Sequence, residues 1–131
     1  MRKRKILYIE DDLTAIEVYE EALEKAGFDI ESLQWGREGL ARLEEIKDGR
    51  KEKPDLILLD LILPDINGLE ILKKAKKDDK LKEIPFIVLT NYGDPKLEQE
   101  CWQVGIEKHI DKTEATPSQL TAIIKNWFKN R

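Results

Sequence analysis

The chain has 131 residues, which is a usual length for one domain, so we expect a single domain over residues 1–131 with one core. Its formal charge of −4, from 23 basic and 27 acidic side chains, argues against a nucleic-acid-binding surface, which needs a clustered basic excess. A lone cysteine, Cys101, excludes an intramolecular disulfide, and no apolar run has the length of a signal-peptide core or a membrane span, so we expect a cytoplasmic protein without a membrane partner.

The first half of the chain begins with a predicted strand over residues 5–10, and a helix follows that ends at Gly27. A second predicted strand covers residues 30–35, and a second, weaker helical pattern closes near Gly49. Apolar residues three and four apart mark the buried side of each helix. The first stripe consists of Ile16, Tyr19, Leu23 and Ala26, and the second of Leu40 and Leu43.

Two further apolar runs, residues 55–60 and 85–90, are continuously hydrophobic, which is typical of strands covered on both faces. They should therefore lie at the centre of a sheet. A helix is predicted just after Asn67-Gly68, and Asp65 and Asn67 are expected to form the turn before it. Another helix is predicted after Asp94, because a capping aspartate is followed there by proline, a residue suited to the first helical position.

The last predicted strand covers residues 108–111, and the last helix begins at Thr116, which forms a capping box with Gln119. A strict alternation of strand and helix predicts an α/β fold, a doubly wound five-stranded parallel sheet with five helices. In that architecture ligands bind at the carboxyl ends of the strands, so functional residues are expected there.

The residues at the predicted strand ends have complementary chemistry: Glu10, Asp11 and Asp12 after the first strand, Asp60 after the third, Thr90 and Asn91 after the fourth, and Lys112 after the fifth. Carboxylates gathered at one rim repel one another unless a cation is present, and oxygen ligands favour Mg²⁺. With such an ion, Asp60 could attack an incoming phosphorus while Lys112 and Thr90 bind phosphoryl oxygens. Asp12 is better explained as the cap of the first helix.

Four segments, ILYIEDD, DLILLDLILPDINGLEIL, PFIVLT and HIDKT, give the chain a resemblance to the response-regulator receiver family over essentially its whole length. The resemblance implies the flavodoxin-like receiver fold of a stand-alone, chemotaxis-Y-like member. It also implies a phosphoacceptor, Asp60, and an acidic pair in which Asp11 binds Mg²⁺ directly and Glu10 partly through water. The remaining implied roles are a metal-binding backbone carbonyl at Ile62, a switch hydroxyl at Thr90 and the family's lysine at Lys112.

Some positions depart from the family pattern. Thr113 replaces the proline that normally follows the lysine, and His109 stands where the family usually carries a switching aromatic residue. Ile62 and Tyr92 occupy positions that tune phosphoryl lifetime in the family, and both are bulky and poorly suited to guiding a hydrolytic water. We therefore expect a long-lived phosphorylated form.

These observations favour a two-component signalling switch that accepts a phosphoryl group from a sensor histidine kinase or a phosphotransfer protein. Its chemistry would be limited to self-catalysed phosphorylation and dephosphorylation, without turnover as an enzyme. Since the last apolar stripe ends just before Arg131, no room is expected for an attached output domain. Output would pass to a protein target through the face formed by the fourth helix, fifth strand and fifth helix, from a monomer or a phosphorylation-dependent homodimer.

Two alternatives remain open, and a third is set aside. A protein-interaction module that is never phosphorylated is compatible with Thr113 and His109. A phosphatase with an aspartate nucleophile would place a second acid two residues later, where this chain has Ile62, and would add a cap domain. A flavin-binding protein needs a phosphate-binding loop after the first strand, and the acidic residues 10–12 would repel that phosphate.

Overall fold

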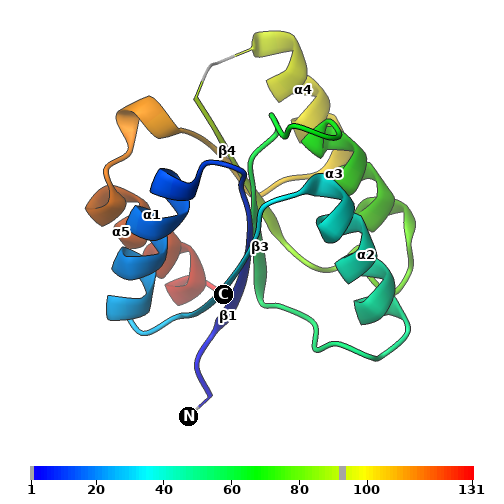
Figure 1. Cartoon of the computed structure of the whole chain (residues 1–131), viewed down its shortest axis with the longest axis horizontal. Coiled ribbons are helices and arrows are strands. Elements are labelled where there is room, and N and C mark those ends of the chain that lie inside the picture. The colour runs from blue at the N-terminus through cyan, green and yellow to red at the C-terminus, as the bar shows by residue number, and fades with distance from the viewer. Residues whose placement is uncertain (1, 92–93) are drawn as a thin grey trace.

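Strands and helices alternate along the described chain, which comprises residues 2–91 and 94–131 of a computed structural model (Figure 1). The strands are β1 (Lys5–Ile9), β2 (Asp29–Leu33), β3 (Leu56–Leu59), β4 (Phe86–Thr90) and β5 (Lys108–Asp111). The helices are α1 (Leu13–Lys25), α2 (Gly36–Lys47), α3 (Gly68–Lys77), α4 (Pro95–Val104) and α5 (Pro117–Lys129), and a 3₁₀ turn, η1 (Lys112–Glu114), follows β5. Each predicted strand and helix is therefore present, in the predicted order.

All of these strands are parallel and form one sheet in the order β2-β1-β3-β4-β5. The two strands predicted to be central, β3 and β4, lie inside the sheet and are buried along their whole length. The outer strand β2 is partly exposed. The predicted fold class, a doubly wound parallel sheet flanked by helices, is confirmed. Its winding reverses between β1 and β3, so the functional crevice is expected at the carboxyl ends of these two strands.

Helices cover both faces of the sheet, with α1 and α5 on one side and α2, α3 and α4 on the other (Figure 1). Among the described residues, the sheet separates two hydrophobic cores, one on each face, where the chain length had led us to expect one. Trp127 and Phe128 of α5 lie in the first of these, on the side of α1 and α5. Leu43, Leu72 and Cys101 lie in the second core. In the two described ranges, none of the helices has the length and apolar character needed to cross a membrane.

Two predicted helix starts are confirmed by their hydrogen bonds. The Asp12 carboxylate caps α1 by accepting from the backbone N–H groups of Thr14 at 3.0 Å and Ala15 at 3.3 Å. At α5, Thr116 and Gln119 exchange the two hydrogen bonds of a capping box, at 3.1 and 2.9 Å. The sequence signals for caps therefore located these boundaries correctly.

The role of Asp65 is larger than the turn position predicted for it. Its carboxylate accepts hydrogen bonds from the backbone N–H groups of Gly36, at 2.9 Å, and Arg37, at 2.8 Å, which form the first turn of α2. Those N–H groups have no partner within their own helix, so a carboxylate from the β3–α3 loop satisfies them. The contact ties the loop that follows Asp60 to a second element.

Candidate functional site

Side chains from separate segments meet at the carboxyl end of the sheet. Glu10 and Asp11 follow β1, Asp60 follows β3, and Lys112 follows β5. A pocket of about 390 Å³ opens among them, and its lining is completed by Asp12, Ile62 and Asn91. The sheet therefore ends in an open, acidic pocket that contains one lysine.

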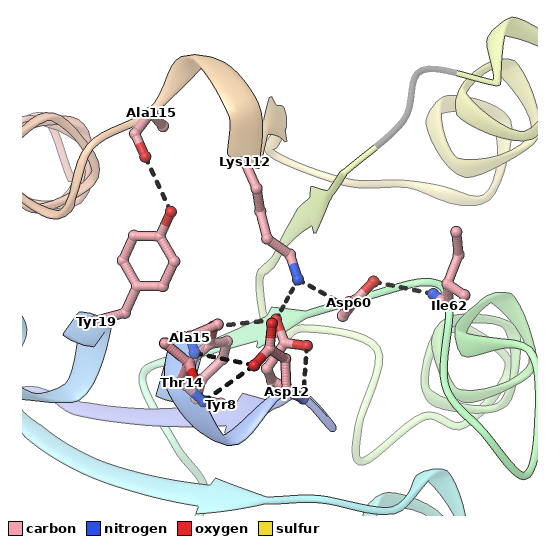
Figure 2. A network of polar contacts seen from close by, with 10 residues as sticks. Tyr8, Asp12, Thr14, Ala15, Tyr19, Asp60, Ile62, Lys112 and Ala115 are labelled. Carbon is pink, nitrogen blue, oxygen red and sulfur yellow. Dashed lines mark hydrogen bonds and ion pairs between the residues drawn. The ribbon is translucent and has the colours of Figure 1, made fainter. Parts of the chain in front are cut away.

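Lys112 bridges the two buried carboxylates of this pocket, Glu10 and Asp60, and Figure 2 shows its contact with Asp60. Its ammonium group donates to Oε1 of Glu10 and lies 2.9 Å from Oδ2 of Asp60. Burial alone would lower the pKa of Lys112, but the hydrogen bonds with Glu10 and Asp60 outweigh that effect and raise its pKa above the usual value. Lys112 is therefore charged at neutral pH and is the internal counterion of both acids.

Asp60 is held from two sides. Oδ1 accepts from the backbone N–H of Ile62 at 2.9 Å, while Oδ2 faces Lys112. Behind it, a Cβ atom added at Gly68 would lie only 2.6 Å from the Asp60 carbonyl oxygen and 2.8 Å from Cα of Leu61. The close approach of α3 therefore requires glycine at this position, and it fixes the backbone that presents the Asp60 carboxylate to the pocket.

The acidic cluster has the composition of a site for a hard divalent cation. Glu10, Asp11 and Asp60 each offer a carboxylate oxygen, and these oxygens lie within 4.8 Å of one another. Desolvation raises the pKa of Asp11, and the negative charge of Glu10 adds to this rise, so a bound cation would favour the ionised carboxylate. One ammonium group does not balance three carboxylates. The oxygen-only donor set and the open pocket therefore fit Mg²⁺ or a similar ion.

Glu10 has a partner that the sequence patterns did not reveal. The buried hydroxyl of Tyr8 donates to Oε1 of Glu10 at 3.2 Å, and the backbone N–H of Asp12 donates to Oε2 at 3.2 Å. Burial, followed by the proximity of Asp60, raises the pKa of Glu10. Residues two apart on a strand share a face, so the spacing of Tyr8 and Glu10 could have predicted their contact. Tyr8 was instead counted as one of the apolar residues of the strand.

Thr90 lies beside the acidic pocket and does not line it. Its hydroxyl is 3.4 Å from Nε2 of His109, and both residues line a smaller neighbouring pocket of about 90 Å³ with Ile62. Nδ1 of His109 lies 3.5 Å from Oε1 of Glu98 on α4. The histidine thus connects the end of β4 to α4, while Ile62, 58% exposed, borders both pockets.

The residue after Lys112 has a local role of its own. The backbone N–H of Thr113 donates to Oδ1 of Asp111 at 2.8 Å, and its hydroxyl donates to the same oxygen at 2.6 Å. Proline has neither donor, so the loop after β5 uses a capping arrangement that depends on threonine. Tyr92, the other predicted tuning position, lies outside the described residues.

Comparisons with known proteins agree with this geometry. The family model described as "Response regulator receiver domain" matches residues 6–125. The polar-differentiation response regulator DivK of Brucella anthropi is 30% identical over 120 residues, which cover 92% of this chain and 93% of DivK. The phosphorylated cyanobacterial phytochrome response regulator RcpA is 32% identical, with a TM-score of 0.82 over 96% of this chain and 91% of RcpA. The Mn²⁺-bound response regulator Rcp1 is 25% identical, with a TM-score of 0.82 over 95% and 94% of the two chains.

Proposed function

Since this chain belongs to the response regulator receiver domain family of two-component signalling, we propose that Asp60 accepts a phosphoryl group from a sensor histidine kinase or a phosphotransfer protein. The observation that carries the proposal is the pairing of Asp60 with Lys112 inside an open acidic pocket. That pairing supplies a nucleophile and a cation for phosphoryl oxygens at one place. The phosphorylated state of the similar protein RcpA supports the assignment.

Mg²⁺ is the proposed cofactor, held by the carboxylates of Glu10, Asp11 and Asp60 and by the backbone carbonyl of Ile62. The clustered carboxylate oxygens support this assignment, as does the Mn²⁺-bound form of the similar protein Rcp1. When bound, the ion would neutralise charge that develops on the transferring phosphoryl group. The exposed position of Asp11 suits a direct ligand, and the tightly held Glu10 suits a ligand that acts partly through water.

The transfer itself needs few protein groups. A carboxylate oxygen of Asp60 forms a bond to phosphorus, the bond from phosphorus to the donor's imidazole nitrogen breaks, and that nitrogen keeps the electron pair. The Ile62 N–H orients the carboxylate through Oδ1. Lys112 turns its charge from Oδ2 of Asp60 toward a phosphoryl oxygen, and the Thr90 hydroxyl binds another. The domain thus takes part in the chemistry as a switch, because the phosphoryl group stays on Asp60 until it is hydrolysed.

The signal would leave the site through His109 and α4. If Thr90 moves toward a phosphoryl group, its contact with His109 changes, and His109 in turn contacts Glu98 of α4. Trp102 of α4 is 47% exposed, so it gives this surface an aromatic contact for a protein target. We propose that residues 1–131 act as a single receiver domain and contact a protein target through the α4–β5–α5 face. The domain would act as a monomer or as a phosphorylation-dependent homodimer.

The test is incubation with acetyl phosphate and Mg²⁺, followed by intact mass spectrometry. We expect the mass of one phosphoryl group to be added to the native protein and to Asp79→Asn, whose altered side chain is 95% exposed and remote from the pocket. The addition should be lost in Asp60→Asn. Modification that persists in Asp60→Asn would place the acceptor elsewhere. No modification, together with no Mg²⁺ binding, would favour an interaction module that is never phosphorylated.

A further inference from the structure

We propose that Tyr8 is a positioning residue for Glu10, which keeps the Glu10 carboxylate oriented toward the metal when Lys112 turns to the phosphoryl group. The inference rests on the proposed function, because it concerns the same metal and the same lysine. Tyr8 lies in the middle of β1 and lines neither the acidic pocket nor the smaller pocket beside it. The contacts around one oxygen atom of Glu10 support the inference.

That oxygen, Oε1, accepts hydrogen bonds from both Lys112 and the hydroxyl of Tyr8, the latter at 3.2 Å. The other oxygen, Oε2, accepts from the backbone N–H of Asp12. Tyr8 and Glu10 are both completely buried, so neither polar group can turn to bulk water. A buried carboxylate that loses a donor is destabilised, and each donor to it therefore matters.

Lys112 cannot serve as a permanent donor to Glu10. Its ammonium group is shared with Asp60, and the proposed transfer requires it to face a phosphoryl oxygen. As Lys112 turns away, Oε1 of Glu10 keeps the Tyr8 hydroxyl as its donor. Tyr8 thus lowers the free-energy cost of moving the lysine and holds the carboxylate in place for the metal during the same step.

The Tyr8 hydroxyl is suited to this role because packing fixes its position. The ring is fully buried beneath α1 and α5 and meets the Tyr19 ring edge-to-face, with centroids 6.5 Å apart and an interplanar angle of 80°. Strand alternation directs Tyr8 and Glu10 to the same side of β1. A rigid donor from the core therefore meets a carboxylate at the rim.

The decisive variant is Tyr8→Phe, which keeps the ring and removes the hydroxyl. We expect apparent Mn²⁺ affinity, measured as free Mn²⁺ by electron paramagnetic resonance, to fall about tenfold, the effect usual for a residue that supports a metal ligand. The Mg²⁺ concentration needed for half-maximal phosphorylation by acetyl phosphate should rise in parallel. At saturating Mg²⁺ the phosphorylation rate should stay below that of the native protein, because Lys112 must still leave Oε1 of Glu10, which then lacks its second donor.

Tyr19→Phe is the matched control. It also removes one buried phenolic hydroxyl, which donates to the Ala115 carbonyl at 2.9 Å and touches no carboxylate of the pocket (Figure 2). We expect this variant to lose stability and to keep native metal affinity. Native affinity in Tyr8→Phe, or an equal loss in Tyr19→Phe, would overturn the role of Tyr8 and leave the proposed function intact. Failure of the native protein to bind either ion would overturn both.

Discussion

The ammonium nitrogen of Lys112 lies 2.9 Å from Oδ2 of Asp60, and each of the two side chains is only 7% exposed. The contact joins the end of β5 to the end of β3, although β4 lies between these strands in the sheet. One long side chain therefore crosses a neighbouring strand to reach the carboxylate. In the absence of a divalent ion, this lysine carries the positive charge that makes the buried acids tolerable.

The first prediction concerns removal of that charge. Lys112→Met should lower the free energy of unfolding, measured in urea without divalent ions, by about 3–5 kcal/mol, because Glu10 and Asp60 lose their buried counterion. Adding Mg²⁺ should stabilise this variant more than the native protein. Lys47→Met, which breaks one ion pair between a 43% exposed lysine and the 19% exposed Asp78, should cost about 1 kcal/mol or less. Equal losses in the two variants would contradict the counterion role.

A second prediction follows from the apolar, 58% exposed side chain of Ile62 at the edge of the acidic pocket. It offers no group to orient a water molecule, so the phosphorylated form should be long-lived. Ile62→Asn should shorten the half-life of the purified phosphoprotein about tenfold. This increase in the hydrolysis rate is smaller than the one that a fully positioned general base gives. The half-life is measured by intact mass after removal of acetyl phosphate. A native half-life of only seconds in Mg²⁺ would contradict the expectation.

The contacts of His109 with Thr90 and Glu98 lead to a third prediction. Beryllofluoride with Mg²⁺ should change hydrogen exchange in α4 of the native protein. In His109→Ala, Asp60 should still accept a phosphoryl group, but most of the change in α4 should be lost because the link from β4 is absent. A native exchange response of α4 in this variant would exclude His109 as the switch residue.

Gly68 provides a fourth prediction, because any side chain there meets backbone atoms. Gly68→Ala should lower the free energy of unfolding by about 1–3 kcal/mol, since the new Cβ would lie 2.6 Å from the Asp60 carbonyl oxygen. Phosphorylation should slow as well, because Asp60 must shift. At Gly39 the atoms nearest to an added Cβ belong to the side chains of Ile9 and Ile71, at 3.0 and 3.2 Å, and side chains can shift. Gly39→Ala should therefore leave the phosphorylation rate unchanged.

The pairing of Glu31 with Arg42 predicts a pH dependence of stability. Two hydrogen bonds from Arg42, each 2.6 Å long, hold the pKa of Glu31 below its usual value of 4.5. The unfolded chain takes up the proton more readily, so the stabilisation is complete above pH 4.5 and is lost as the pH falls through the lower folded pKa.

Because the Glu31 side chain is 56% exposed, solvent screening limits this stabilisation to about 0.5–1 kcal/mol. Urea unfolding should show that difference between the native protein and Glu31→Gln at neutral pH. The difference should vanish once the pH has fallen below the lowered folded pKa of Glu31, where the carboxylate of the native protein is protonated as well. A difference that stays constant over this range would show that packing, and not charge, is responsible.

The sequence by itself determined the elements and the place of the site. Apolar residues at helical spacing, caps such as Asp12 and Thr116, and the continuous apolar runs of β3 and β4 are local signals, so each could be recognised without the rest of the chain. Ligands bind at the carboxyl ends of parallel strands, and this rule predicted that Asp11, Asp60 and Lys112 lie together at one end of the sheet.

Only the tertiary structure decided which polar atoms meet. The Asp65 carboxylate caps a helix that begins 29 residues earlier, and Lys112 reaches Glu10 across 102 residues. The Tyr8 hydroxyl finds its partner only because packing under α1 and α5 fixes the ring. Periodicity shows which face of an element is buried, but a hydrogen bond depends on the direction and length of two side chains. Those are set when separate segments pack together, so no local pattern contains them.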